Sequence, residues 1–173
     1  QERNINMGFL TGKPVIITGA GRATLSDGSC GSIGYGIATA YAKEGANLVI
    51  TGRNVSKLEK AKEELEGKYG IKVLALQADI SEGADNENIA KDVAEAAMKE
   101  FGRIDVLINN APPKMRGIEN CSYEDFVSAL NVGVTAAFYL TKLFMPYLAD
   151  GASIINISSS RDRMSQPQTE SYT

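Results

Sequence analysis

Three glycines near the N-terminus have the residue type and the spacing to bind a phosphate group. Gly31, Gly34 and Gly36 lie in the segment GSIGYG, after a short apolar run at positions 14–18 and at the start of a helical pattern from Ile33. Glycine lets the backbone approach a pyrophosphate closely, and free amides at a helix N-terminus attract its negative charge. Strand, glycine loop and helix together predict a dinucleotide-binding segment.

The composition excludes several other chemistries. The 173 residues include no histidine, which removes Ser-His-Asp hydrolysis and most zinc chemistry. A net charge of −3 without a basic block argues against nucleic acid or an anionic membrane as a partner. No apolar run approaches the ~18 residues of a membrane span. Cys30 and Cys121 lack metal-ligand spacing and favour a reducing, cytoplasmic setting with no metal site.

Strand and helix patterns alternate along one domain-sized chain. Apolar strand runs are expected at 14–18, 46–51, 71–76, 104–108 and 153–157, and helices at 33–42, 55–69, 87–101 and 122–148. We expect Ser122 to cap the last helix and Gly70 to end the second. This alternation predicts an α/β fold, a parallel sheet with helices on both faces. Right-handed crossovers give the Rossmann-type doubly wound strand order 3-2-1-4-5.

Polar or glycine-containing segments follow every predicted strand. In a doubly wound sheet, ligands bind at the carboxyl ends of the strands, beside the switch between strands 1 and 4. We therefore expect one ligand site formed by Thr18-Gly19, Gly52-Arg53, Asp79, Asn109-Asn110-Ala111 and Ser158-Ser159-Ser160.

The end of the second strand indicates which cofactor fits. An acidic residue there favours NAD, whereas a basic residue can contact the 2′-phosphate of NADP. The strand ends at Thr51-Gly52-Arg53, and a planar guanidinium suits phosphate. Arg22, in the glycine loop, is a second candidate for the same phosphate. The sequence therefore predicts NADP in preference to NAD.

These features resemble the short-chain dehydrogenase/reductase family over positions 12–173. Tyr172 follows Ser159 by 13 residues, the usual spacing of the family's serine and tyrosine. The Thr-Gly opening, Asp79, the Asn-Asn-Ala run and Asn131 also fall at signature positions. The segment SIGYGIATAYAKEGANLVITGRN is most similar to bacterial hydroxysteroid dehydrogenases of the bile-acid 12α type. The part after Ala111 is similar to generic reductases such as the 3-oxoacyl-carrier-protein reductases.

The resemblance implies hydride transfer between a nicotinamide cofactor and a small ketone or secondary alcohol. It makes Tyr172 the general acid/base, Ser159 the hydrogen-bond partner of the substrate oxygen, and Asn131 a proton relay. Asp79 is expected to accept from the adenine amino group, and Asn109 to lie against the adenosine ribose. The remaining implied cofactor contacts are Gly19, Ser32, Ile33, Gly34, Ile80 and Ala111. Relatives are usually tetramers, so a homotetramer or homodimer is expected.

The sequence departs from the family pattern in several ways. Ser32 replaces a glycine, a segment around positions 24–30 is inserted before it, and Pro112 follows the Asn-Asn-Ala run. Enoyl-carrier-protein reductases also have an altered glycine loop, but Ser159 argues against them.

The sequence also stops at Thr173, before the family's lysine four residues beyond the tyrosine and before the C-terminal part of the fold. We expect a piece of an active enzyme, forming a single NAD(P)-binding domain over 1–173. The alternatives are a 3-oxoacyl-carrier-protein reductase and a nucleotide-binding regulatory protein without turnover.

Overall fold

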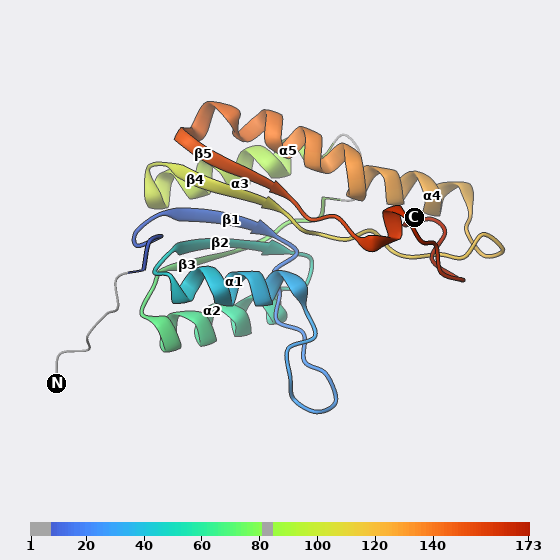
Figure 1. Ribbon diagram of the computed structural model, residues 1–173. Coiled ribbons are helices and arrows are strands. Elements are labelled where there is room, and N and C mark those ends of the chain that lie inside the picture. The colour runs from blue at the N-terminus through green and yellow to red at the C-terminus, as the bar shows by residue number, and fades with distance from the viewer. Residues whose placement is uncertain (1–7, 81–84) are drawn as a thin grey trace.

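Five parallel strands form the centre of the computed structural model, which describes residues 8–80 and 85–173 (Figure 1). Their order is β3-β2-β1-β4-β5, which confirms the doubly wound order predicted from the sequence. The strands are β1 (Pro14–Thr18), β2 (Asn47–Gly52), β3 (Val73–Gln77), β4 (Ile104–Asn109) and β5 (Leu148–Asn156). All of them run in the same direction, so their carboxyl ends lie along one edge.

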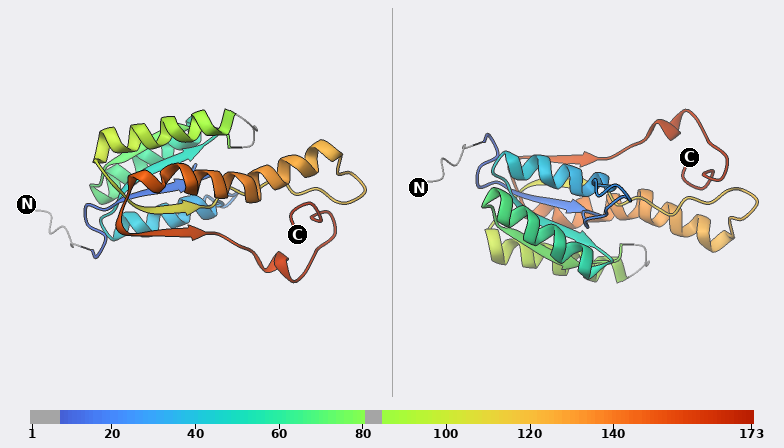
Figure 2. Two further views of the ribbon diagram at one scale, coloured as in Figure 1. Left: turned by 90° about the horizontal axis from the view of Figure 1, so that it is seen from above. Right: turned by 90° about the horizontal axis from the view of Figure 1, so that it is seen from below.

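Helices cover both faces of the sheet, as the two further views show (Figure 2). Helices α1 (Ile33–Lys43) and α2 (Val55–Tyr69) lie on one face, and α3 (Asp85–Phe101) and α5 (Ala136–Phe144) on the other. Successive residues of β1 alternate between two cores, because strand side chains point to opposite faces. Val15 and Ile17 belong to the core under α1 and α2, whereas Ile16 belongs to the core under α3 and α5.

Local capping fixes where several helices begin and end. The Ser32 hydroxyl caps α1 by accepting a hydrogen bond from the Tyr35 amide, and Asn54 caps α2 in the same way. Ser122 caps α4 (Tyr123–Leu130), accepting from the Asp125 amide at 3.0 Å. Gly70 ends α2 with a φ of +66°, a left-handed conformation that costs glycine little. These starts and stops agree with the sequence pattern.

The long helix expected over 122–148 is present as Tyr123–Tyr147, but it is not a regular α-helix throughout. A π-helical turn, η1 (Asn131–Thr135), separates α4 from α5, and the Ala136 amide donates to the Asn131 carbonyl. A 3₁₀ turn, η2 (Met145–Tyr147), then ends the helix at Pro146, whose ring lacks an N–H to continue it. Strand β5 begins directly afterwards at Leu148, which pairs with Ile104, rather than at position 153; the register then shifts before Val106 pairs with Ser153.

The composite helix Tyr123–Tyr147, of 25 residues, is also long and apolar enough to cross a membrane, since its most apolar 18-residue stretch has a mean hydropathy of 1.3. The expectation that no segment approaches this length therefore holds only for unbroken apolar runs, because Lys142 interrupts this one. Leu140 and Phe144 pack with residues of α3 in the core. This part of the helix thus has a place in the folded domain.

The central strands β1 and β4 are joined where the sheet reverses its order. The Thr18 hydroxyl accepts hydrogen bonds from the amides of Asn110, at 2.9 Å, and Ala111, at 3.1 Å. The Asn110 side-chain amide donates to the carbonyls of Thr18, at 2.9 Å, and Gly19, at 3.3 Å. The loops that follow β1 and β4 are therefore held against each other at the edge where a ligand site is expected.

Candidate functional site

A cleft of about 940 Å³ opens at the carboxyl ends of the strands. The glycine loop and the first turn of α1 form one side, and residues from α4, η1, α5 and the C-terminal segment form the other. A smaller hollow of about 200 Å³ shares Gly19, Gly52 and Arg53 with the cleft and extends towards the loop after β3. The cleft thus opens at the strand ends singled out in the sequence, and ligand binding there stays a prediction.

Most of the residues singled out in the sequence lie in these two hollows. The larger one is lined by Gly19, Ser32, Ile33, Gly34, Arg53, Ile80, Asn109, Ala111, Ser159 and Tyr172. Asp79 lines the smaller hollow together with Arg53 and Ile80. Arg22 and Asn131 line neither of them. Their proposed roles, like those of the lining residues, stay predictions.

Gly34 and Gly19 pack closely against the loops beside the cleft. A Cβ on Gly34 would lie 2.3 Å from the Gly19 carbonyl oxygen and 2.5 Å from the Asn110 side-chain nitrogen. A Cβ on Gly19, which has a φ of +69°, would lie 2.9 Å from the Ala111 Cα. Helix α1 therefore begins in direct contact with both central loops. We call the glycine loop and the first turn of α1 the glycine cradle. First-turn amides have no partner within their own helix, so the glycine cradle fits the pyrophosphate of a dinucleotide.

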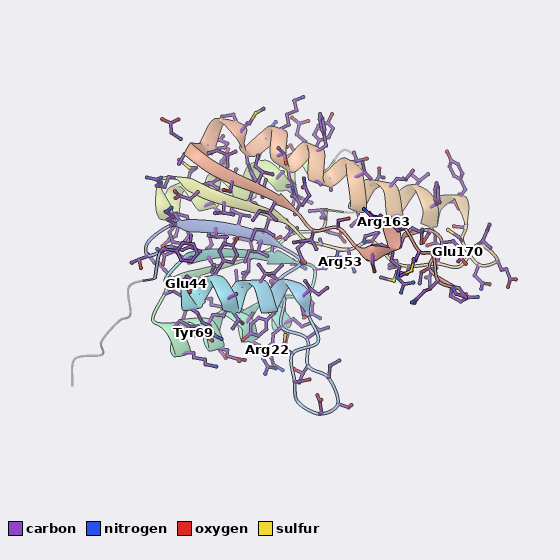
Figure 3. The ribbon with its side chains drawn as sticks, viewed as in Figure 1. Arg22, Glu44, Arg53, Tyr69, Arg163 and Glu170 are labelled. Carbon is purple, nitrogen blue, oxygen red and sulfur yellow. The ribbon has the colours of Figure 1, made fainter. Side chains whose placement is uncertain are left out.

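Arg22 is engaged away from the cleft. Its Nε lies 2.5 Å from Glu64 Oε2 on α2, and its Nη1 donates to the Thr24 hydroxyl at 2.5 Å. The guanidinium also lies 6.0 Å from the centre of the Tyr35 ring on α1. Figure 3 shows Arg22 beside the two helices and Arg53 at the strand ends. Contact of Arg22 with a 2′-phosphate would require the pair with Glu64 to open.

The same cluster shifts two ionisation equilibria. The hydrogen bond and charge of Glu64 raise the pKa of Arg22 above its usual value. Burial, together with Glu64, raises the pKa of Tyr35 to about 12. Both groups therefore keep their protons at neutral pH. Arg22 stays a cation whose charge is balanced by Glu64.

The inserted segment projects from the body of the domain as a loop (Figure 1). Thr24 and Cys30 form an isolated antiparallel bridge at its base, and the Asp27 carboxylate accepts hydrogen bonds from the amide and the hydroxyl of Ser29. These bonds lower the pKa of Asp27. Only Ala23 and Gly31, where the loop joins the domain, line the cleft. The loop is exposed, and its base lies beside the predicted pyrophosphate site.

The C-terminal segment brings Tyr172 to the cleft that Ser159 also lines. Ser171 and Arg116 bond twice, Arg116 N to Ser171 Oγ at 2.8 Å and Ser171 N to the Arg116 carbonyl at 3.0 Å. The Ile118 amide donates to the Glu170 carboxylate at 3.1 Å. The segment before Tyr172 is thus tied to the loop after β4. Ser159 follows β5 and accepts from the Arg161 amide at 3.3 Å.

Asn109 joins three elements on the far side of the cleft. Its side-chain amide donates to Asn156 at 2.8 Å on β5 and to Thr141 at 3.4 Å on α5. Its side-chain carbonyl oxygen is buried and has no hydrogen-bond partner within the described residues. A buried acceptor without a partner is unusual in a folded protein. It leaves one position in the lining for a donor from a ligand.

The apolar wall of the cleft was not predicted from the sequence. It is formed largely by the helix that contains the π turn, through Phe126, Leu130, Val132 and Val134. The signal was present: the helix carries more apolar residues than one buried stripe needs. Arg161 also lines the cleft.

The chain belongs to the short chain dehydrogenase family, whose model matches residues 13–173. It is 48% identical over 156 residues to a 12alpha-hydroxysteroid dehydrogenase from a Clostridium species, covering 88% of this chain and 58% of that protein. The fold is shared with L-sorbose reductase from Gluconobacter frateurii complexed with NADPH and L-sorbose, with a TM-score of 0.77 and 28% identity, covering 96% of this chain and 59% of that chain.

An alcohol dehydrogenase from the archaeon Thermococcus sibiricus, complexed with 5-hydroxy-NADP, is similar to the same degree. Its TM-score is 0.77 at 26% identity, and the match covers 92% of this chain and 63% of that chain. The chain thus spans about three fifths of the length of these relatives.

The ion pair between Arg22 and Glu64 is expected to hold the base of the inserted loop against α2. We expect Glu64→Gln to release Arg22 and to speed thermolysin cleavage near Leu25 roughly two- to five-fold, the effect of losing one exposed ion pair. Glu63→Gln removes the same charge from the neighbouring exposed position and should leave the cleavage rate unchanged. Equal rates in the wild type and both variants would show that the pair does not hold the loop.

Proposed function

We propose that this chain binds NADP and supplies the catalytic side chains of an oxidoreductase that interconverts a secondary alcohol and a ketone. One observation carries the proposal: Ser159 and Tyr172 line the same cleft as the glycine cradle at the start of α1. A hydroxysteroid is the proposed substrate, because the chain is 48% identical to a 12alpha-hydroxysteroid dehydrogenase. The apolar wall of the cleft suits such a rigid, apolar molecule.

The roles of the side chains follow from their chemistry. The nicotinamide, when bound, accepts or supplies the hydride. The Ser159 hydroxyl donates a hydrogen bond to the substrate oxygen, and the Tyr172 phenol gives that oxygen its proton in reduction or takes it in oxidation. Asn131 begins the π turn whose next residues line the cleft, and we propose it as a member of the proton relay. π turns often occur at functional sites.

The preference for NADP rests on Arg53. Its side chain lies at the end of β2, lines both hollows and has no ion pair within the described part of the chain. A free guanidinium can bind a 2′-phosphate through two parallel hydrogen bonds. Asp79, in the smaller hollow, is proposed to bind the adenine, and the buried carbonyl oxygen of Asn109 to accept from a ribose hydroxyl.

The exposed apolar face of the composite helix is proposed as a contact between copies of this chain. Phe138 and Met145 are 66% and 61% exposed and lie outside the cleft. Only 17% of the most apolar stretch of this helix is buried. Contiguous exposed apolar surface usually marks an interface. We therefore expect a homodimer or homotetramer, and a single monomeric species in sedimentation equilibrium would contradict this assembly. The cytoplasmic location and the reduced thiols proposed from the sequence are a separate expectation.

Arg53→Ala tests the choice of cofactor. Loss of a charge-assisted contact should weaken NADP binding about ten-fold or more, while NAD binding hardly changes because NAD lacks the phosphate. Fluorescence titration with both cofactors measures the two affinities. Arg163→Ala is the matched control, since Arg163 is 88% exposed and lines neither hollow. Equal losses for NAD and NADP in the Arg53 variant would show that Arg53 does not select the phosphate.

Tyr172→Phe tests the chemistry. The change removes only the hydroxyl, so NADPH binding should remain while single-turnover oxidation of NADPH by a steroid ketone slows about 10²- to 10⁴-fold. The measurement uses the protein that contains this chain, with Tyr123→Phe as control because Tyr123 is 79% exposed on α4. Undiminished turnover in the Tyr172 variant contradicts the mechanism. NADPH binding without any turnover in the wild type would favour a regulatory protein.

A further inference from the structure

The loop that follows β4 is hydrogen-bonded to the segment that carries Tyr172. We call positions 114–120 the β4 loop and positions 168–173 the tyrosine segment. The Ser171 amide donates to the Arg116 carbonyl at 3.0 Å, and the Arg116 amide donates to the Ser171 hydroxyl at 2.8 Å. These two partners are 55 positions apart in the chain. The residue before the proposed acid/base is therefore held through both its backbone and its side chain.

The Ser171 hydroxyl bridges two points of the β4 loop. Besides accepting from the Arg116 amide, it donates to the Lys114 carbonyl at 3.4 Å. The preceding residue, Glu170, is bound as well, because its carboxylate accepts from the Ile118 amide at 3.1 Å. Figure 3 shows Glu170 on this segment. Two successive residues of the tyrosine segment are thus tied to the β4 loop, and Tyr172 follows them directly.

Gly117 lies against the start of the tyrosine segment and has no room for a side chain. A Cβ at position 117 would lie 2.9 Å from Gln168 Cα and 2.6 Å from Gln168 Oε1. Gln168 is also the one non-glycine residue with a positive φ, +68°, within residues 8–80 and 85–173. This conformation is uncommon for such a residue, and surrounding contacts maintain it. The close approach to Gly117 is one of these contacts.

The β4 loop is itself anchored on both sides. Before it, the amides of Asn110 and Ala111 are bound by the Thr18 hydroxyl at the end of β1. Within it, Arg116 Nε lies 3.6 Å from Asp125 Oδ2 in the first turn of α4. The loop therefore gives the tyrosine segment a reference that is fixed to the central strands and to α4.

We propose that Ser171 and Gly117 are positioning residues for Tyr172. Through them the β4 loop holds the phenol in the cleft that Ser159 also lines. This inference rests on the proposed function, since it explains how the acid/base of the same reaction is placed. The placement matters because a misplacement of ~1 Å can slow a reaction about 100-fold. Gly117 lies outside the cleft, so its effect on the reaction passes through the tyrosine segment.

Ser171→Ala tests the tie, because it removes both bonds of the hydroxyl and keeps the bond of the amide. In the protein that contains this chain, single-turnover oxidation of NADPH by a steroid ketone should slow about 10- to 100-fold, while the Kd of NADPH stays unchanged. In the Tyr172→Phe background the same change should cost nothing further, because a positioning residue acts through the phenol. Ser171→Thr keeps a hydroxyl and should keep most of the rate.

Gly117→Ala tests the same placement from the loop side. The added Cβ must displace Gln168, so turnover should slow to a similar degree, and again only where Tyr172 is present. Gly67→Ala is the matched control, since a Cβ at position 67 on α2 meets nothing within 4 Å. Ser165→Ala is the control for the serine change. It removes a hydroxyl that has no bond to the β4 loop within the described residues, and turnover should not change.

The outcomes separate this inference from the function on which it rests. Slowing by the same factor with and without the Tyr172 hydroxyl would make Ser171 a structural residue only and overturn the positioning role. Undiminished turnover in both Ser171→Ala and Gly117→Ala would overturn it too. Both results leave the proposed function intact, because the wild type still oxidises NADPH. A wild type without any turnover overturns the proposed function and the positioning role together.

Discussion

The hydrogen bonds around the Thr18 hydroxyl position everything else at the site. Thr18 ends β1 and is 3% exposed. Its hydroxyl oxygen accepts hydrogen bonds from the backbone amides of Asn110 and Ala111, which follow β4. Because the helices after β1 and β4 leave on opposite faces of the sheet, a crevice forms between the two loops. The threonine fixes the spacing of those loops. The glycine cradle, the Asn109 network and the walls of the cleft all depend on that spacing.

The backbone contact between Gly34 and Gly19 leaves no room for a side chain at position 34. Gly34 lies against the Gly19 carbonyl and the Asn110 side chain, so the first turn of α1 is placed by contact rather than by a flexible loop. The long insertion before Ser32 can therefore project outward without moving the helix start. The salt bridge between Arg22 and Glu64 holds the base of that insertion against α2. The position of the start of α1 beside the cleft is thus independent of the conformation of the inserted loop.

The helix from Tyr123 to Tyr147 serves three surfaces at once. Leu140 and Phe144 pack in the core with α3, Phe126 and Leu130 line the cleft, and Phe138 remains exposed. A regular α-helix keeps one direction for each face, whereas the π turn at Asn131–Thr135 inserts a residue and rotates the faces of α4 relative to α5. This rotation lets one helix leave the sheet and continue along the cleft.

The sequence by itself determined the sheet order, the helix cap at Ser122, the helix end at Gly70, and the edge of the sheet at which the cleft opens. These features depend on periodicity, β-branched runs and capping within a few neighbouring residues, so local sequence carries them. Only the tertiary structure decided the π turn and the early start of β5 at Leu148, since both depend on packing and register between distant segments. It also decided which arginines are free. Arg22 meets Glu64 across 42 positions of chain, whereas Arg161 meets no carboxylate among the described residues. The charge that a ligand encounters is set by such long-range pairs, which no local pattern records.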